Sequence, residues 1–153
     1  MLGAPLPAWI RPIAGALLLA LLAPVACSPQ ETPTAAEAGQ TLKAHILQLL
    51  KERNAQNVTI TDPGGKDIPC GDGKAKQTFA ATGEDLPARG SDALTDALLG
   101  ALKRVAPYEL VASGRPGEPM RVRNSASHTS LTLASSESGQ YVVRGETECL
   151  TSH

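Results

Sequence analysis

The chain has 153 residues with 14 basic and 15 acidic side chains, a formal net charge of −1 at pH 7. Such a balance gives no electrostatic basis for nucleic-acid binding, so no nucleic acid is expected as a partner. Only 3% of the residues are aromatic, so the core must be built mainly from aliphatic side chains, and the length suits one small domain.

The first predicted element is an export signal over residues 1–26. Arg11 precedes an apolar run from Pro12 to Ala26. That run of about fifteen residues suits the apolar region of a signal peptide and is shorter than the roughly 20 residues that a membrane-spanning helix needs. Because the signal holds one basic and no acidic side chain, its removal leaves 13 basic and 15 acidic side chains, a charge of −2.

The end of this signal resembles the bacterial lipobox. Val25, Ala26 and Cys27 match its last three positions, and Pro24 stands where leucine is usual. The resemblance implies that Cys27 is lipidated and that two or more acyl chains hold the protein on the membrane. The polar, proline-containing residues 27–34 are then a tether. An ordinary secretory cut and an uncut membrane anchor remain as alternatives.

Cys70 and Cys149 are the two cysteines left once Cys27 is acylated. Because thiols oxidise outside the cytoplasm, we expect a disulfide between them. It would close a loop of about 80 residues and stabilise the fold by roughly 4 kcal/mol in the chain-entropy model. The alternative is a pair of buried free thiols.

Residues 35–153 are predicted to form a single domain that begins with a helix and two strands. Apolar residues recur at steps of three and four over residues 34–54, which indicates an amphipathic helix. Period-two alternation over residues 57–61 and again over residues 74–82 predicts two strands.

The second half of the domain is predicted to contain a helix and four short strands. Ser91 is expected to cap the helix and Pro107 to end it. On the last strand, alternation puts Cys149 on the core-facing side, where a bridge to Cys70 would be shielded from water. The four strand ranges, with turn residues at 113–117 and 135–139, are 108–112, 120–124, 127–134 and 140–149.

The predicted fold class is therefore α+β, in the order helix, two strands, helix, four strands. Two helices would pack on one face of an antiparallel sheet of about six strands, joined by one disulfide. These patterns do not give the order of the strands within the sheet.

Two stretches of the domain and its lipobox-like start resemble small actinobacterial lipoproteins that have no assigned activity. The stretches are "IPCGDGKAKQTFAATGE" and "GQYVVRGETECL". In those lipoproteins a Cys-Gly step and a terminal Gly-x-Thr-x-Cys stretch bracket the domain. The resemblance implies a surface-anchored, disulfide-linked domain.

The glycine-rich stretch "DPGGKDIPCGDGK" lacks the spacing of a ligand-binding loop. Ile60 and Ile68 stand where a phosphate-binding loop has its first glycine. Its aspartates recur every five residues, unlike those of an EF-hand calcium loop. We expect a structured turn that carries a disulfide cysteine, with no cofactor.

The three histidines form no recognisable metal site. His45 lies at the edge of the first helix's apolar stripe, His128 is expected on the outer face of a strand, and His153 is the last residue of the sequence. None of them pairs with another histidine or a cysteine at zinc-ligand spacing, so no metal is expected.

Basic side chains alternate onto the outer face of two predicted strands. Arg121 and Arg123 share one strand and Arg144 lies on another, so the three form a candidate basic strip that would suit an anionic polymer or lipid headgroups. The alternative is an ordinary solvated sheet face. The acidic residues available to balance it are Glu109, Glu146 and Glu148.

No motif assigns a reaction, so no catalytic residue is named. We expect an extracytoplasmic lipoprotein at the cell membrane that serves as a non-catalytic binding or envelope-support domain. Its partners would be the membrane, through the lipid anchor, and an unidentified envelope protein or ligand. One alternative is a small hydrolase with a site assembled around His45 or His128. Another is a partner or inhibitor of an envelope protein, with an exposed apolar patch.

Overall fold

Two helices and nine strands follow one another in the computed structural model, which describes residues 31–87, 89–113, 115 and 118–152. The expected signal and lipidation site, Cys27, lie outside the described residues, as do His153 and three residues of the turn predicted at 113–117. The elements are α1 (Ala35–Glu52), β1 (Gln56–Asp62), β2 (Ile68–Gly71), β3 (Lys74–Lys76), β4 (Thr78–Glu84), α2 (Ser91–Leu102), β5 (Glu109–Ala112), β6 (Met120–Asn124), β7 (Thr129–Ser135), β8 (Gln140–Thr147) and β9 (Leu150–Thr151).

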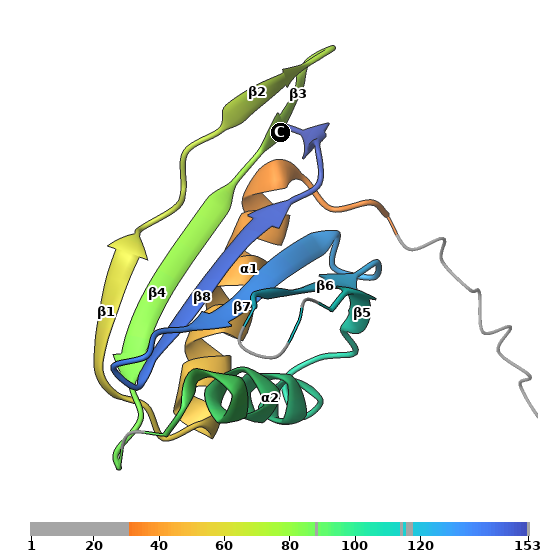
Figure 1. The fold of residues 1–153 in the computed structure, drawn as a ribbon. Helices are drawn as coiled ribbons and strands as arrows, with labels where there is room; N and C mark the ends of the chain where they lie inside the picture. Colours follow the sequence, from red (N-terminus) through yellow and green to blue (C-terminus); the bar gives the residue numbers. More distant parts are fainter. Residues whose placement is uncertain (1–30, 88, 114, 116–117, 153) are drawn as a thin grey trace, which may run out of the picture. The chain divides into compact units, whose positions relative to one another are not determined.

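Six of the strands form one antiparallel sheet in the order β1-β4-β8-β7-β6-β5. Strand β4 pairs with β8, so the early part of the chain is joined to its last long strand, and β5 to β8 follow one another as a meander. Helix α1 runs along β4 and β8, and α2 packs against β7 (Figure 1). The predicted α+β class, the two helices and the six-stranded antiparallel sheet are confirmed.

Helix α1 has defined signals at both ends. Thr34 is its N-cap, and a capping box joins Thr34 and Glu37 through reciprocal hydrogen bonds. Asn54 follows the helix at φ +50°, while the N–H groups of Asn54 and Ala55 donate to the carbonyls of Lys51 and Leu50. This is the Schellman arrangement, which satisfies the free carbonyls of the last turn.

Helix α2 begins differently from the prediction. Gly90 occupies the N-cap position without a side-chain hydrogen bond, and Ser91 is the first helical residue. The Ser91 carbonyl instead accepts hydrogen bonds from the hydroxyls of Thr95 and Ser135, which attach the start of α2 to β7. The helix ends at Leu102, before the predicted stop at Pro107.

The core lies between the helices and one face of the sheet. It is aliphatic apart from Phe79 and Tyr141, both fully buried. At Gly145 on β8 the sheet has no side chain, and Leu42 of α1 packs directly over the backbone there. The other buried apolar residues of this cluster are Ile46, Leu49, Leu50, Ala81, Leu94, Leu98, Ala101, Leu102, Val122, Leu131, Leu133 and Val143.

A second, three-stranded sheet, β2-β3-β9, was not predicted. It extends from the main sheet beyond the N-terminal end of α1 (Figure 1). The predicted strand at residues 74–82 is divided between the two sheets as β3 and β4, with Gln77 between them. Ala75 and Leu150 of the small sheet pack against Ala35 and Ala38 of α1.

The predicted disulfide between Cys70 and Cys149 is present, with 6.0 Å between the two Cα atoms. It links β2 to the residue before β9 and closes the small sheet. The prediction that this bridge is shielded from water is wrong, because both cysteines are exposed. Alternation along the last strand ends at Thr147, so it no longer determines the side on which Cys149 lies.

None of the helices within the described residues is both long enough and apolar enough to cross a bilayer.

Candidate functional site

The face of the main sheet that carries no helix presents polar side chains from several strands. Alternation along β4, β6, β7 and β8 sends most of their large apolar residues toward the helices and leaves mainly small, hydroxyl and charged residues on this open face. The strand register places Asp62 of β1, Ala80 of β4, Arg144 of β8, Thr132 of β7 and Arg121 of β6 in one row. Two arginines of the predicted basic strip therefore flank Thr132.

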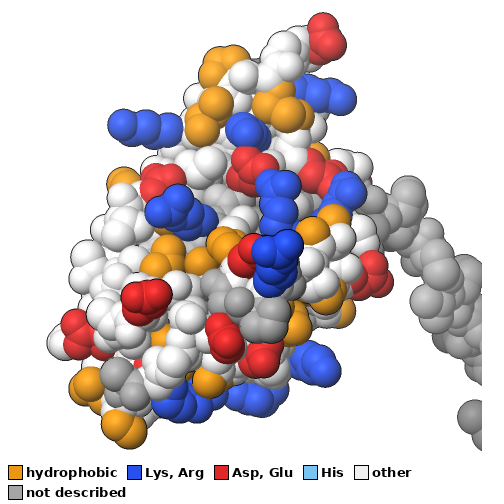
Figure 2. All heavy atoms as spheres, viewed as in Figure 1, with side chains coloured by type: hydrophobic (Ala, Val, Ile, Leu, Met, Phe, Trp, Pro, Cys, Tyr) orange, Lys and Arg blue, Asp and Glu red, His pale blue; other side chains and the backbone are white. Residues whose placement is uncertain are grey.

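This row crosses a groove of about 490 Å³ in the open face. Its volume falls in the range of small-molecule sites, roughly 300 to 1,000 Å³. Figure 2 looks onto this face and shows basic and acidic side chains interspersed over it. Arg121 lies at one end of the row, on β6, and Asp62 lies at the other, on β1.

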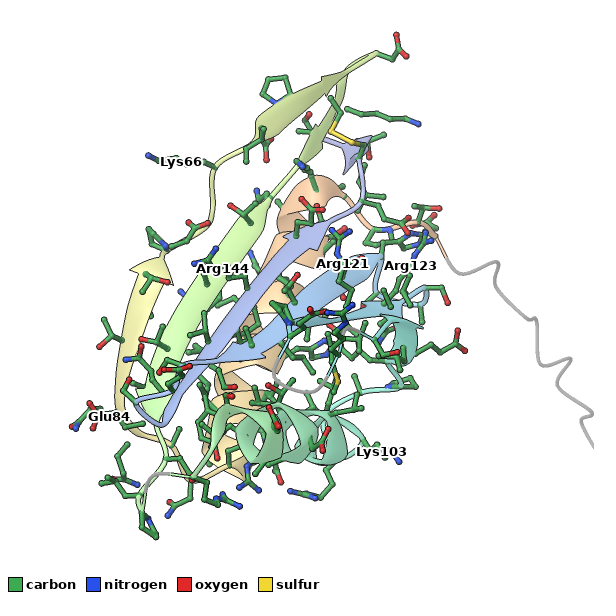
Figure 3. The ribbon with its side chains drawn as sticks, viewed as in Figure 1. Lys66, Glu84, Lys103, Arg121, Arg123 and Arg144 are labelled. Carbon is green, nitrogen blue, oxygen red and sulfur yellow. A yellow bond between two sulfur atoms is a disulfide. The ribbon has the colours of Figure 1, made fainter. Side chains whose placement is uncertain are left out.

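The arginines of the groove have unused hydrogen-bonding capacity. Arg144 extends from β8 and Arg121 from β6 (Figure 3). Both side chains are exposed, and neither forms an ion pair or a side-chain hydrogen bond with any residue that the structure describes. Two guanidinium groups with ten N–H donors in total are thus free to bind a ligand.

Arg123, the third residue of the predicted strip, is in a different situation. Its guanidinium forms an ion pair with Glu148, and the other oxygen of that carboxylate lies 2.8 Å from His128 Nδ1. The hydrogen bond from His128, followed by that from Arg123, lowers the pKa of Glu148. The structure therefore brings Arg121 and Arg144 into one groove and leaves Arg123 beside it, balanced by a carboxylate.

The two carboxylates that line the groove are already held by other groups. Asp62 accepts a hydrogen bond of 2.6 Å from the Thr78 hydroxyl and one of 3.0 Å from the N–H of Gly64. The Thr78 bond, followed by the Gly64 bond, lowers the pKa of Asp62. Glu146 forms an ion pair of 2.8 Å with Lys76. Neither carboxylate pairs with Arg121 or Arg144.

The two described histidines lie in separate contacts. His45 Nδ1 is 3.0 Å from the Tyr108 hydroxyl, and burial lowers the pKa of His45. The Tyr108 hydroxyl is in turn 2.7 Å from that of Thr129. His128 lies in the turn before β7, at φ +53°, and not on a strand face as predicted, because the strand begins one residue later.

A hydrolase of the kind considered above would place a histidine against a serine. Within residues 31–152, leaving aside the few that are not described, no histidine forms a hydrogen bond with a serine. Nor do three or more potential metal ligands cluster anywhere in the described part of the chain.

Sequence analysis missed the residues that complete the groove. Thr78, Ser130 and Thr132 line it together with the arginines, and Asp62 lies at its far end. Their alternation with apolar neighbours showed that they face away from the helices. Which of them lie together depends on the pairing of β4 with β8, and no local pattern encodes that pairing.

Comparisons of the chain with protein-family models, curated proteins and solved structures give no match. The function is therefore inferred from the sequence and from the geometry of the domain.

Proposed function

We propose that the protein is a lipoprotein held on the extracytoplasmic face of the cell membrane through Cys27, and that its domain binds a ligand in the groove of the open sheet face. The observation that carries the binding role is the pair of groove arginines that have no partner among the described residues. The lipid anchor rests on the lipobox-like residues 25–27 and on a disulfide of the kind found in oxidising compartments.

The open sheet face is suited to binding because its polar groups project from a rigid scaffold. Each arginine lies on an inner strand of the main sheet, with hydrogen-bonded neighbours on both sides. Binding groups on such strands are held in place better than groups on loops. The helices and the core lie on the other face, so a ligand can enter the groove without disturbing them.

Ligand mapping tests the binding role. The full-length protein, expressed with its leader and purified in the form that the cell makes, is titrated with neutral, anionic and cationic small molecules and with envelope glycan fragments. Backbone amide shifts are then followed by NMR. Shifts concentrated at Ser130, Thr132 and their neighbours in the row would support a site in the groove. Shifts that never include the groove, whatever the ligand, would exclude it.

Intact mass of the protein from its native membrane tests the anchor. We expect a chain that starts at Cys27, carries the added mass of acyl groups and gains two hydrogens on reduction of the disulfide. Cys27→Ser is the control and should lose the acyl mass and the membrane retention. A chain that keeps residues 1–26, or one cut there without lipid, would contradict the proposed anchor.

A second function, as partner of an envelope protein, is favoured by one further observation. Leu110 and Val111 are consecutive on edge strand β5 and are 49% and 64% exposed. Exposed apolar residues beside the free hydrogen-bonding groups of an edge strand favour pairing with another chain. A photocrosslinker at position 111, used in the native envelope, should capture one defined protein that a crosslinker at Lys103 does not. Equal patterns from both positions would refute this role.

A further inference from the structure

The free arginines and the carboxylate end of the groove together indicate the chemistry of its ligand. Resting on the binding role proposed above, we propose that the groove takes a phosphorylated sugar or polyol. Its phosphate would lie between Arg121 and Arg144 over Thr132, and its hydroxyl groups would point toward Thr78 and Asp62.

The spacing of the row allows both arginines to reach the same group. Neighbouring strands lie about 4.8 Å apart, so positions two strands apart are separated by roughly 10 Å. Arg121 and Arg144 are separated in this way, with Thr132 between them. Both side chains are long and carry no partner among the described residues, so the two guanidinium groups can meet over the Thr132 hydroxyl without breaking an existing bond.

The number of donors favours a tetrahedral oxyanion over a carboxylate. A bidentate arginine takes one acceptor position on each oxygen of a carboxylate and leaves about two positions for further donors. Two arginines and a hydroxyl supply donors for at least five hydrogen bonds, more than the about four that a carboxylate accepts. The three non-bridging oxygens of a phosphate monoester can accept them, whereas a diester has two such oxygens. Because Glu146 is balanced by Lys76, the field of the arginines at this end of the groove is not cancelled by that carboxylate.

The rest of the groove is too large and too polar for a phosphate alone. About 490 Å³ is available, enough for a small molecule attached to the phosphate. At the end formed by β1 and β4, each oxygen of Asp62 has one donor in the structure and can accept another. These acceptors suit the hydroxyl groups of a sugar or polyol, and the small side chain of Ala80 leaves room between the two ends.

Isothermal titration of the full-length protein with three phosphate probes tests the inference. The probes are inorganic phosphate, glucose 6-phosphate as a free monoester, and a glycerol phosphate oligomer as an envelope-type phosphodiester. At least one of the two esters should bind about tenfold or more tightly than inorganic phosphate. The tighter ester identifies the source: a diffusible metabolite in one case and an envelope polymer in the other. Equal binding of all three probes would mean an adventitious ion only and would overturn the proposal.

Three substitutions at the two groove arginines and one substitution outside the groove locate the binding energy. Arg121→Ala and Arg144→Ala should each weaken ester binding by about tenfold or more, since a hydrogen bond to a charged group is lost. Arg144→Lys keeps the charge and loses the bidentate geometry, so it should also weaken binding. Lys103→Ala, at the end of α2, is the matched control and should bind as the original protein does.

The outcomes separate this inference from the binding role on which it rests. If all three arginine variants bind the ester as tightly as the original protein does, the assignment of the phosphate to Arg121 and Arg144 is overturned. If neutral sugars bind the groove as tightly as their phosphates do, the proposal that the ligand carries a phosphate is overturned and the binding role remains. If no phosphate probe binds but another ligand shifts the amides of the groove, the inference again fails alone. If nothing binds the groove, both proposals fail.

Discussion

Asp85→Asn should destabilise the fold by about 2 kcal/mol at neutral pH. Asp85 follows β4, is 6% exposed and accepts two hydrogen bonds from Arg89, of 2.7 and 2.8 Å. It also accepts a bond of 2.6 Å from the buried Tyr141 hydroxyl, which Arg53 contacts from the end of α1. One carboxylate therefore ties the loop after β4 to β8, and through Tyr141 to α1.

The magnitude follows from the pKa of this carboxyl group. The hydrogen bonds from Arg89 lower the pKa of Asp85 from 3.8 to about 2, and the bond from Tyr141 contributes in the same direction. At 1.36 kcal/mol for each pKa unit, the difference corresponds to about 2.4 kcal/mol of stability. Because the Arg89 side chain is 46% exposed and therefore partly screened, we expect somewhat less, about 2 kcal/mol.

The pH dependence of the free energy of unfolding separates the contribution of the Asp85 charge from that of its side-chain packing. A folded pKa below the unfolded one means that the stabilisation is complete above about pH 4 and is lost as the pH falls through about 2. Urea unfolding of the original protein and of Asp85→Asn, followed by circular dichroism, should give free energies of unfolding that converge as the pH falls from about 5 to about 2. A difference in free energy of unfolding that is as large at pH 2 as at pH 7 would refute this reasoning. Asp96→Asn, exposed on α2, is the control and should change stability by less than about 0.5 kcal/mol.

Three other substitutions test the disulfide, the core and the start of α1. Replacing Cys70 and Cys149 together by alanine should cost about 4 kcal/mol in urea unfolding, because the 79-residue separation that the bridge closes becomes free in the unfolded chain. Dithiothreitol should also reduce the bridge in the folded protein, without denaturant, since both cysteines are exposed. A bridge that resists dithiothreitol would contradict their exposure. Gly145→Ala should cost about 1 to 3 kcal/mol, because its Cβ would lie 2.8 Å from Leu131 Cδ2 and closer still to Leu42; an unchanged melting temperature would show that the core adapts. Thr34→Ala removes the capping box and should cost about 1 kcal/mol, and a calorimetric melt that does not shift would show that the cap contributes nothing.

The sequence allowed the elements of the fold to be predicted wherever their signal was local. Helix α1 and the six strands of the main sheet are visible as periodic apolar residues, and alternation also placed Phe79 and Ala81 toward the core. The small sheet escaped prediction because β3 and β9 have only three and two residues, too few to show alternation. The turn containing His128 was read as part of a strand, although the Asn-Ser-Ala-Ser run before it is typical of a turn.

The candidate site could be predicted only in part, for a related reason. Alternation identified Arg121, Arg123 and Arg144 as facing away from the core, and this is a property of each strand alone. That Arg144 shares a row with Arg121 while Arg123 pairs with Glu148 depends on the register of β6, β7 and β8 and on the chain beyond β8. Asp62 joins the row only because β4 pairs with β8 across α2 and the meander.

The position of the free arginines follows from the way the sheet buries one face. Under a helix, an unpaired guanidinium would lose its water and would need a carboxylate beside it, since a buried charge without a partner is strongly destabilising. The buried side of β6 and β8 accordingly carries Val122, Tyr141 and Val143. On the open face Arg121 and Arg144 keep their water, so they can stay unpaired at little cost in stability. A ligand that replaces that water must then supply the negative charge itself, and this is why the proposed ligand is an anion.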